Sequence, residues 1–314
     1  MVLLHLAEGL EPWPILEEKT GLPREALKAE LLQLKAEGFP VRIEEEGAGL
    51  EPGTPAPQIL LPLLRGRLGR PYRYLGLVPS TQDVLRGWRD APCGALVLAE
   101  RQTFGRGRHG RRWESPPGNL YFSVLLEDTD NLLPLRAGLA LAEAAEVGVL
   151  KWPNDLLAPD GRKLAGILVE AQGKRVFLGV GINVRTAPLP SSAALAEFRP
   201  VNRAQLLARF LWALENWLEQ EKERVLCAWR ERNVTLGRWV VVATGNEVLE
   251  GLAVDLGPQG ELLLRTKSGL KAVFSGDVIS VGTKEVEDPE VREGETESGG
   301  SGHSEGKRPG PSAE

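Results

Sequence analysis

Short apolar segments with the length of strands dominate the middle of the chain, and they restrict the folds that it can adopt. They lie at residues 94–99, 120–126, 149–152, 164–170 and 176–182. Residues 171–175 separate the last two segments and have the length of a hairpin connection. Helical periodicity lies between and after the strands, at residues 82–89, 132–147 and 203–223. Residues 66–235 are therefore predicted to form an α+β domain with a mixed or antiparallel sheet.

A second, smaller β unit is predicted for residues 237–282. Its apolar segments are evenly spaced, and turns that contain glycine separate most of them. They lie at residues 238–243, 250–256, 261–265, 270–274 and 278–281. Five short strands with this spacing predict a small β-barrel.

Residues 1–63 are predicted to form a small helical unit. One short helix begins at Pro14 and ends at Gly21, and a second begins at Pro23 and ends at Gly38. A strand pair around Gly47-Ala-Gly49 follows. Two helices across a short turn, followed by a β-wing, are the layout of a winged helix-turn-helix. A helical hairpin that contacts only protein fits the same pattern.

Charge is unevenly distributed along the chain. The net charge is −5, and residues 284–314 carry nine acidic and four basic residues, so the remainder is balanced. Without a basic excess, a non-specific nucleic-acid binder is not predicted. Residues 283–314 are rich in glycine, serine and glutamate and are predicted to be a disordered tail.

The chain is expected to be a cytoplasmic protein. No apolar run approaches the roughly 18 residues that a membrane span needs. The first residues lack the basic region of a signal peptide. Cys93 and Cys227 are the only cysteines, too few for a disulfide framework and without the neighbours that a zinc site needs.

The segment from Gln102 to Trp113 carries the strongest chemical signal. It combines three glycines with four arginines and one histidine, directly after an apolar strand. Glycine lets a backbone approach a ligand closely, and arginine supplies a fixed fork of donors for phosphate or carboxylate. The segment favours an anion-binding loop around Arg106, Gly107 and Arg108. A solvated basic loop is the alternative.

Polar residues near strand ends add further candidates. Lys151 could neutralise a polyphosphate together with the arginine-rich loop, although a lone lysine in this place is usually a surface residue. Asn154 and Asp155 carry oxygen atoms of the kind that Mg²⁺ prefers, but they also fit a turn. Asn183 ends a strand that contains glycines, where a backbone can approach a ligand closely.

The order of these segments resembles that of the biotin protein ligases. The order is Ser80-Thr-Gln82, the glycine–arginine loop, Lys151-Trp-Pro-Asn-Asp155, Lys163–Glu170 and Gly179–Asn183. Taken alone, Ser80 or Thr81 would merely cap the helix that follows. The resemblance implies a biotin-lipoate ligase fold, related to class II aminoacyl-tRNA synthetases, between an N-terminal winged helix and a C-terminal SH3-like barrel.

The resemblance also implies the reaction and its residues. Biotin and ATP, with Mg²⁺, would form biotinyl-5′-AMP, which then biotinylates a lysine of a carrier domain such as that of acetyl-CoA carboxylase. Lys151 and Arg108 would be catalytic, and Asn154 and Asp155 would bind the metal. Biotin would contact Ser80, Thr81, Gln82, Gln102, Arg106, Gly107, Arg108, Trp113 and Lys151. The adenylate would contact Arg106, Arg108, Lys151, Lys163 and Asn183.

The sequence departs from the family pattern at three places, and it leaves two rival functions to be considered. His109 replaces a further arginine, Gln82 replaces the common asparagine, and residues 185–199 contain no tryptophan to stack on adenine. A lipoate ligase is disfavoured, because its Arg-Arg-x-Gly-Gly-Gly pattern is absent from the sequence. A bifunctional ligase and biotin-responsive repressor is the alternative function, and a homodimer is a candidate assembly of the chain. Acidic residues beside Arg24 and Lys28 in the second helix make DNA binding doubtful.

Overall fold

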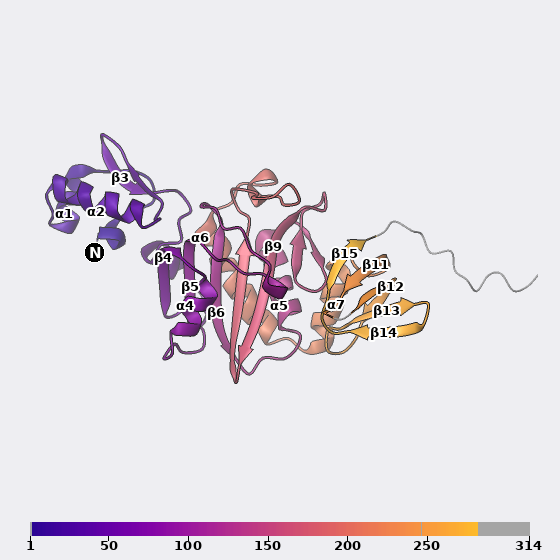
Figure 1. Ribbon diagram of the computed structural model, residues 1–314. Coiled ribbons are helices and arrows are strands. Elements are labelled where there is room, and N and C mark those ends of the chain that lie inside the picture. Colours follow the sequence, from indigo (N-terminus) through magenta and orange to yellow (C-terminus); the bar gives the residue numbers. More distant parts are fainter. Residues whose placement is uncertain (1, 246, 282–314) are drawn as a thin grey trace, which may run out of the picture.

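The computed structural model describes residues 2–245 and 247–281, so the predicted tail at residues 283–314 lies outside the described residues. The described strands form three sheets, of three, seven and five strands, which follow one another along the chain (Figure 1). Among these residues, no helix combines the length and the apolar character needed to cross a membrane.

The seven-stranded central sheet has the order β4-β5-β6-β10-β9-β8-β7. β4 and β5 are parallel, and the other pairs are antiparallel, which confirms the predicted mixed sheet. The strand prediction missed β4, which mixes polar and apolar residues, and β8, which is only three residues long. The strands are β4 (Tyr72–Val78), β5 (Leu96–Gln102), β6 (Leu120–Glu127), β7 (Val149–Lys151), β8 (Asp155–Leu157), β9 (Lys163–Gln172) and β10 (Arg175–Ile182).

Helices lie on both faces of the central sheet. On one face, α5 (Leu133–Ala145) packs against α6 (Arg203–Leu218) and α7 (Lys222–Arg232) and contributes to the main apolar core. On the other face, α4 (Thr81–Gly87) covers a separate apolar cluster. The cluster uses Val97, Leu125 and Phe177, which alternate along their strands with residues of the main core.

The single helix predicted for residues 203–223 is wrong. The chain leaves α6 at Glu219 and starts α7 at Lys222. The buried Arg136 donates hydrogen bonds to the carbonyl oxygens of Trp217 and Gln220. These hydrogen bonds satisfy carbonyl groups at the end of α6. Because Arg136 is far from α6 in the sequence, no local pattern indicates that the helix ends there.

The N-terminal unit contains the predicted two helices and strand pair in the predicted order. Its hairpin turn is at residues 44–46, however, not at Gly47-Ala-Gly49, because these residues lie within β3. A Cβ atom at Gly49 would lie 1.6 Å from the carbonyl oxygen of Gly9, so the glycine permits close backbone packing. The elements are η1 (Val2–His5), β1 (Glu11–Pro12), α1 (Trp13–Thr20), α2 (Arg24–Ala36), β2 (Val41–Ile43), β3 (Gly47–Leu50), α3 (Pro57–Leu60) and η2 (Leu61–Leu63).

The C-terminal sheet contains the five predicted strands and is antiparallel throughout, with the order β14-β13-β12-β11-β15. Buried residues such as Val240, Val242, Leu262 and Leu264 alternate along the strands and form its apolar side. The strands are β11 (Trp239–Ala243), β12 (Val248–Leu256), β13 (Leu262–Thr266), β14 (Gly269–Val273) and β15 (Asp277–Val281).

Candidate active site

A pocket of about 240 Å³ lies where the central sheet meets the glycine–arginine loop. Lys151, Asp155 and Asn183 are not among its lining residues. Asp155 and Asn183 adjoin it through Lys163, whose Nζ lies 2.6 Å from Asp155 Oδ1 and whose carbonyl oxygen accepts from Asn183. Lys151 is the register partner of Asp155. Most of the predicted site residues do line it: Ser80, Thr81, Gln82, Gln102, Arg106, Gly107, Arg108, Trp113, Asn154 and Lys163.

A buried network of amides and hydroxyls forms one end of the pocket. The Thr81 backbone N–H donates to Gln102 Oε1 at 2.9 Å, and the Thr81 hydroxyl lies 2.9 Å from that of Ser123. Ser123 in turn donates to Gln82 Oε1 at 2.8 Å. Gln102 Nε2 donates to the Ser115 hydroxyl at 3.1 Å. Because these groups fix one another's orientation, this end is suited to a small polar head group with both donors and acceptors.

Ser80 is the residue before the first turn of α4. In the described structure its side chain makes no capping hydrogen bond, so the capping interpretation is wrong for this residue. Ser80 is only 2% exposed, yet it lines the pocket. Its hydroxyl is therefore placed to contact a ligand.

Two glycines form a flat surface under the pocket. Gly166 and Gly181 are register partners on β9 and β10. A Cβ atom at Gly181 would lie 2.5 Å from Nε1 of Trp113, and one at Gly166 would lie 3.0 Å from the same ring. Lys163 Nζ lies 5.4 Å from the ring centroid. Trp113 therefore forms an apolar wall that packs on the glycines and extends toward the cationic end.

The C-terminal sheet holds the glycine–arginine loop at the other end. Arg108 donates to the Ser275 hydroxyl and to the Gly276 carbonyl oxygen, both at 3.1 Å, between β14 and β15. Arg111 donates to Asp277 at 2.8 Å. Burial lowers the pKa of Arg108, while the nearby Asp277 raises it. The connection between β14 and β15, together with the first residue of β15, thus fixes two arginines of the loop.

Arg106 has a different environment. Its guanidinium donates to Asp83 on α4 at 2.7 Å and lies 3.5 Å from Glu170 on β9. The loop is consequently anchored on the side of the polar network as well. His109, in the short turn η3 (Arg108–Gly110), has a φ of 54° and lies 3.8 Å from Asp277.

Lysines on β7 and β9 make the second end of the pocket cationic. Lys151 is the register partner of Asp155, which contacts Lys163. Burial lowers the pKa of Lys151, Asp155 raises it, and Lys163 and Arg111 lower it. Asp277 also raises the pKa of Lys151, so Lys151, Lys163 and Arg111 stand against the two carboxylates of Asp155 and Asp277, and positive charge exceeds negative charge here. Such an excess can stabilise a carboxylate beside a phosphate.

Asn183 directly follows β10 and is 1% exposed. Its Nδ2 donates to the carbonyl oxygen of Lys163 at 3.1 Å, but within the described residues its buried Oδ1 has no hydrogen-bond partner. A buried acceptor without a partner is unusual in a native protein and suggests a donor on a ligand.

The predicted metal ligands already have other partners. Asn154 Oδ1 accepts from Arg108 at 3.3 Å, and its Nδ2 donates to the Ile167 carbonyl at 2.7 Å. Asp155 contacts Lys163. Residues 2–245 and 247–281 contain no group of three or more His, Cys, Asp or Glu side chains that could hold a metal ion. The described part of the chain thus offers no cage of such side chains for a cation.

Comparison with known proteins identifies the family. Residues 74–186 match the Biotin/lipoate A/B protein ligase family, and residues 235–280 match the Biotin protein ligase C terminal domain. The bifunctional ligase/repressor BirA of Escherichia coli is 30% identical over 292 residues, which cover 84% of this chain and 90% of the relative. The chain belongs to the biotin protein ligase family.

Further relatives agree with this assignment to the biotin protein ligases. The biotin--[acetyl-CoA-carboxylase] ligase of Mycobacterium tuberculosis is 36% identical over 211 residues, 59% of this chain and 79% of the relative. The solved biotin protein ligase from Aquifex aeolicus, in complex with biotin and ATP, is 32% identical with a TM-score of 0.60. The match covers 66% of this chain and 97% of that structure. The C-terminal match also favours a biotin ligase over a lipoate ligase.

Sequence reasoning missed several residues of this biotin protein ligase site. Ser123 carries a hydroxyl in the middle of the apolar strand β6, a signal that could have been recognised. Asp83 and Glu170, the partners of Arg106, resemble ordinary surface acids in the sequence. Asp277 lies 166 residues after Arg111, so no local pattern connects the two.

Proposed function

We propose that this protein joins biotin to a lysine of a carrier domain at the expense of ATP, through biotinyl-5′-AMP. The observation that carries the proposal is the pocket, which has a buried amide–hydroxyl network at one end and an excess of lysine and arginine at the other. Biotin has a ureido head group with donors and acceptors, an apolar ring and a carboxylate tail. The head group would contact Ser80, Thr81, Gln82 and Gln102, and the ring would contact Trp113.

The first step joins the two anionic substrates. A carboxylate oxygen of biotin attacks the α-phosphorus of ATP, the bond to the bridging oxygen breaks, and pyrophosphate leaves. Lys151, Lys163 and Arg108 would lie around the place where the two anions meet and would stabilise the negative charge of the transition state. Asn183 would accept a hydrogen bond from the adenine amino group. The loop would also keep water away from the mixed anhydride.

Mg²⁺ would enter with ATP as part of the substrate. The cation commonly keeps several waters and binds through substrate phosphates and one or two carboxylates. Asp155 is the candidate carboxylate, because a phosphate of ATP would compete with it for Lys163 and so free its oxygen atoms for the cation. This arrangement agrees with the absence of a metal-binding cluster in the described part of the chain.

The second step transfers the biotinyl group. The amine of the carrier lysine attacks the acyl carbon, loses a proton, and AMP leaves with the electrons of the broken C–O bond. No protein nucleophile is needed. The relatives named biotin--[acetyl-CoA-carboxylase] ligase suggest that the carrier belongs to a biotin-dependent carboxylase, and the protein would act in the cytoplasm.

Exchange of labelled pyrophosphate into ATP tests the first step. We expect exchange only when biotin is present, because the forward reaction needs its carboxylate. Parallel reactions that contain lipoate instead of biotin, or neither of the two compounds, are the controls. Exchange that depends on lipoate but not on biotin would contradict the proposed substrate.

A further inference from the structure

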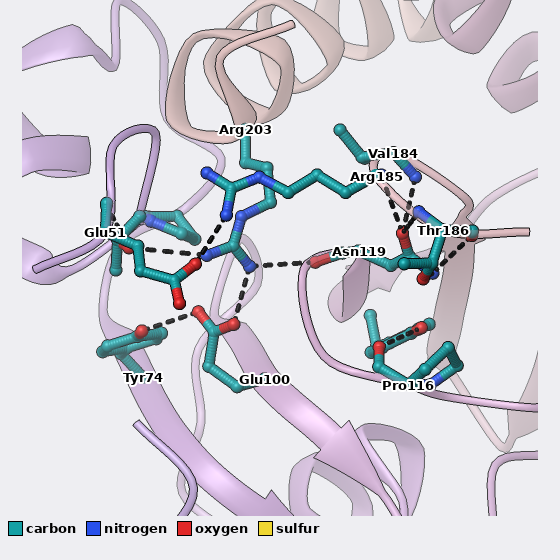
Figure 2. A network of polar contacts seen from close by, with 12 residues as sticks. Glu51, Tyr74, Glu100, Pro116, Asn119, Val184, Arg185, Thr186 and Arg203 are labelled. Atoms are coloured by element: carbon teal, nitrogen blue, oxygen red, sulfur yellow. Dashed lines mark hydrogen bonds and ion pairs between the residues drawn. The ribbon is translucent and has the colours of Figure 1, made fainter. Parts of the chain in front are cut away.

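Asn119, just before β6, organises the backbone that follows Asn183. It is fully buried, and its Oδ1 accepts three backbone hydrogen bonds, from Val184 at 2.8 Å, Arg185 at 3.0 Å and Thr186 at 3.1 Å (Figure 2). Its Nδ2 donates to the carbonyl and hydroxyl oxygens of Thr186. One side chain therefore fixes residues 184–186, which directly continue the strand end that carries Asn183.

A buried ion pair holds Asn119 in turn. Arg203, at the start of α6, donates to the Asn119 carbonyl oxygen at 3.0 Å and to Glu100 at 2.6 Å (Figure 2). Both charged side chains are almost completely buried, at 0% and 1% exposure. Tyr74 donates to the other Glu100 oxygen at 2.6 Å. The additional hydrogen bonds fix the geometry of this buried pair. Separation of the two partners would leave an uncompensated buried charge, so the pair is a firm support for Asn119.

The N-terminal unit contacts the same segment from outside. Arg185 pairs with Glu51 and donates to the Pro52 carbonyl oxygen, directly after β3 (Figure 2). Arg203 also lies 3.4 Å from the hydroxyl of Thr54. Residues 51–54 thus connect the N-terminal sheet to residues 184–186, and through them to Asn183.

We propose that Asn119 is a positioning residue for the nucleotide end of the pocket, and that the Arg185–Glu51 ion pair makes the N-terminal unit part of this support. The inference rests on the proposed function, in which Asn183 contacts adenine. The amide–hydroxyl network at the biotin end uses none of these groups. Loosening residues 184–186 should consequently weaken ATP binding and leave biotin binding unchanged.

The test is pyrophosphate exchange with purified full-length variants, with KM measured separately for ATP and for biotin. Arg185→Ala removes a partly exposed ion pair and should raise KM for ATP by about threefold to fivefold. Glu51→Ala should act in the same direction, and the double variant should exceed the larger single effect only slightly, because both remove one interaction. Asn119→Asp keeps the acceptor but loses the donor to Thr186, and should raise KM for ATP by about tenfold.

Arg42→Ala is the matched control. It removes an ion pair of similar exposure, with Glu44, within the same N-terminal unit but outside this network. We expect both KM values to stay at the wild-type level. An unchanged KM for ATP in Arg185→Ala, or an equal rise for both substrates, would overturn the inference. The Arg185 and Glu51 variants still decide it if Asn119→Asp does not fold. Absence of biotin-dependent exchange in the wild type would refute the proposed function itself, and the inference with it.

Discussion

At the scale of single residues, the contact between Gly181 and Trp113 leaves no room for a larger side chain at position 181. Any Cβ at position 181 would overlap the indole ring. We expect Gly181→Ala to displace Trp113 and to raise KM for biotin by about tenfold, since overpacking typically costs about 1–3 kcal/mol. Gly245→Ala is the control, because no described atom lies within 4 Å of its added Cβ. Unchanged biotin binding in Gly181→Ala would contradict the assignment of Trp113 to the biotin end.

Lys151 is the residue for which we predict the largest effect on rate. If it stabilises charge during adenylation, Lys151→Ala should raise the barrier of that step by about 3 kcal/mol, as for loss of a preorganised donor elsewhere. The melting temperature should hardly change. Lys174→Ala removes a lysine that is 84% exposed and serves as the control. Single-turnover formation of biotinyl-5′-AMP measures the step, and a wild-type rate would show that Lys151 does not take part.

Asp155 should set the pH dependence of Lys151. Burial holds the pKa of Lys151 below its ordinary value, and Asp155 partly opposes this shift. The adenylation rate should therefore fall as pH rises through the pKa of Lys151. Asp155→Asn removes the opposing charge, lowers that pKa further and should move the alkaline limb to lower pH. A limb that stays in place or moves to higher pH would show that another group controls it.

At the scale of elements, the glycine–arginine loop depends on the connection between β14 and β15. Asp277→Ala removes the partner of Arg111, so the loop should open more often. We expect the release of biotinyl-5′-AMP to become faster by about twofold to fivefold, as for loss of an exposed ion pair. Limited proteolysis at the loop arginines should also become faster in the absence of substrates.

Asp255→Ala provides a control for this experiment within the same C-terminal sheet. Asp255 pairs with Arg230 instead of with the loop, so the release rate should stay at the wild-type value. Equal release and equal cleavage in wild type and Asp277→Ala would show that the C-terminal sheet does not hold the loop.

Elements with local signals were predictable from the sequence, and those fixed by distant contacts were not. Short apolar segments predicted β5, β6, β9 and β10, and these strands bring most of the recognised motifs to one pocket. The break between α6 and α7 depends on Arg136, and the anchoring of the loop depends on Asp277. Neither contact leaves a periodic or compositional signal. The site residues came mostly from a family resemblance, because charge and spacing alone indicate only an anion-binding loop.

At the scale of the whole molecule, the N-terminal unit is poorly suited to bind DNA through α2. Arg24 donates to the Glu45 carbonyl oxygen at 2.8 Å, and both Arg24 and Lys28 lie over the Trp13 ring. Residues 44–46 of the hairpin turn are all glutamate. Because phosphate contacts need available cations, we expect no binding to duplex DNA in mobility-shift assays at physiological salt, with or without biotinyl-5′-AMP. Specific, adenylate-dependent binding to a palindromic site would contradict this prediction.

The central claim is that the pocket makes biotinyl-5′-AMP and transfers its acyl group to a protein lysine. Mass spectrometry of a purified biotin carrier domain, incubated with this protein, biotin and Mg-ATP, tests both steps together. We predict a shift by a single biotinyl group that is lost when biotin or ATP is left out, or when the acceptor lysine of the carrier is replaced by arginine. A carrier of unchanged mass in the complete reaction, with the protein folded and the carrier active toward another biotin ligase, would contradict the account.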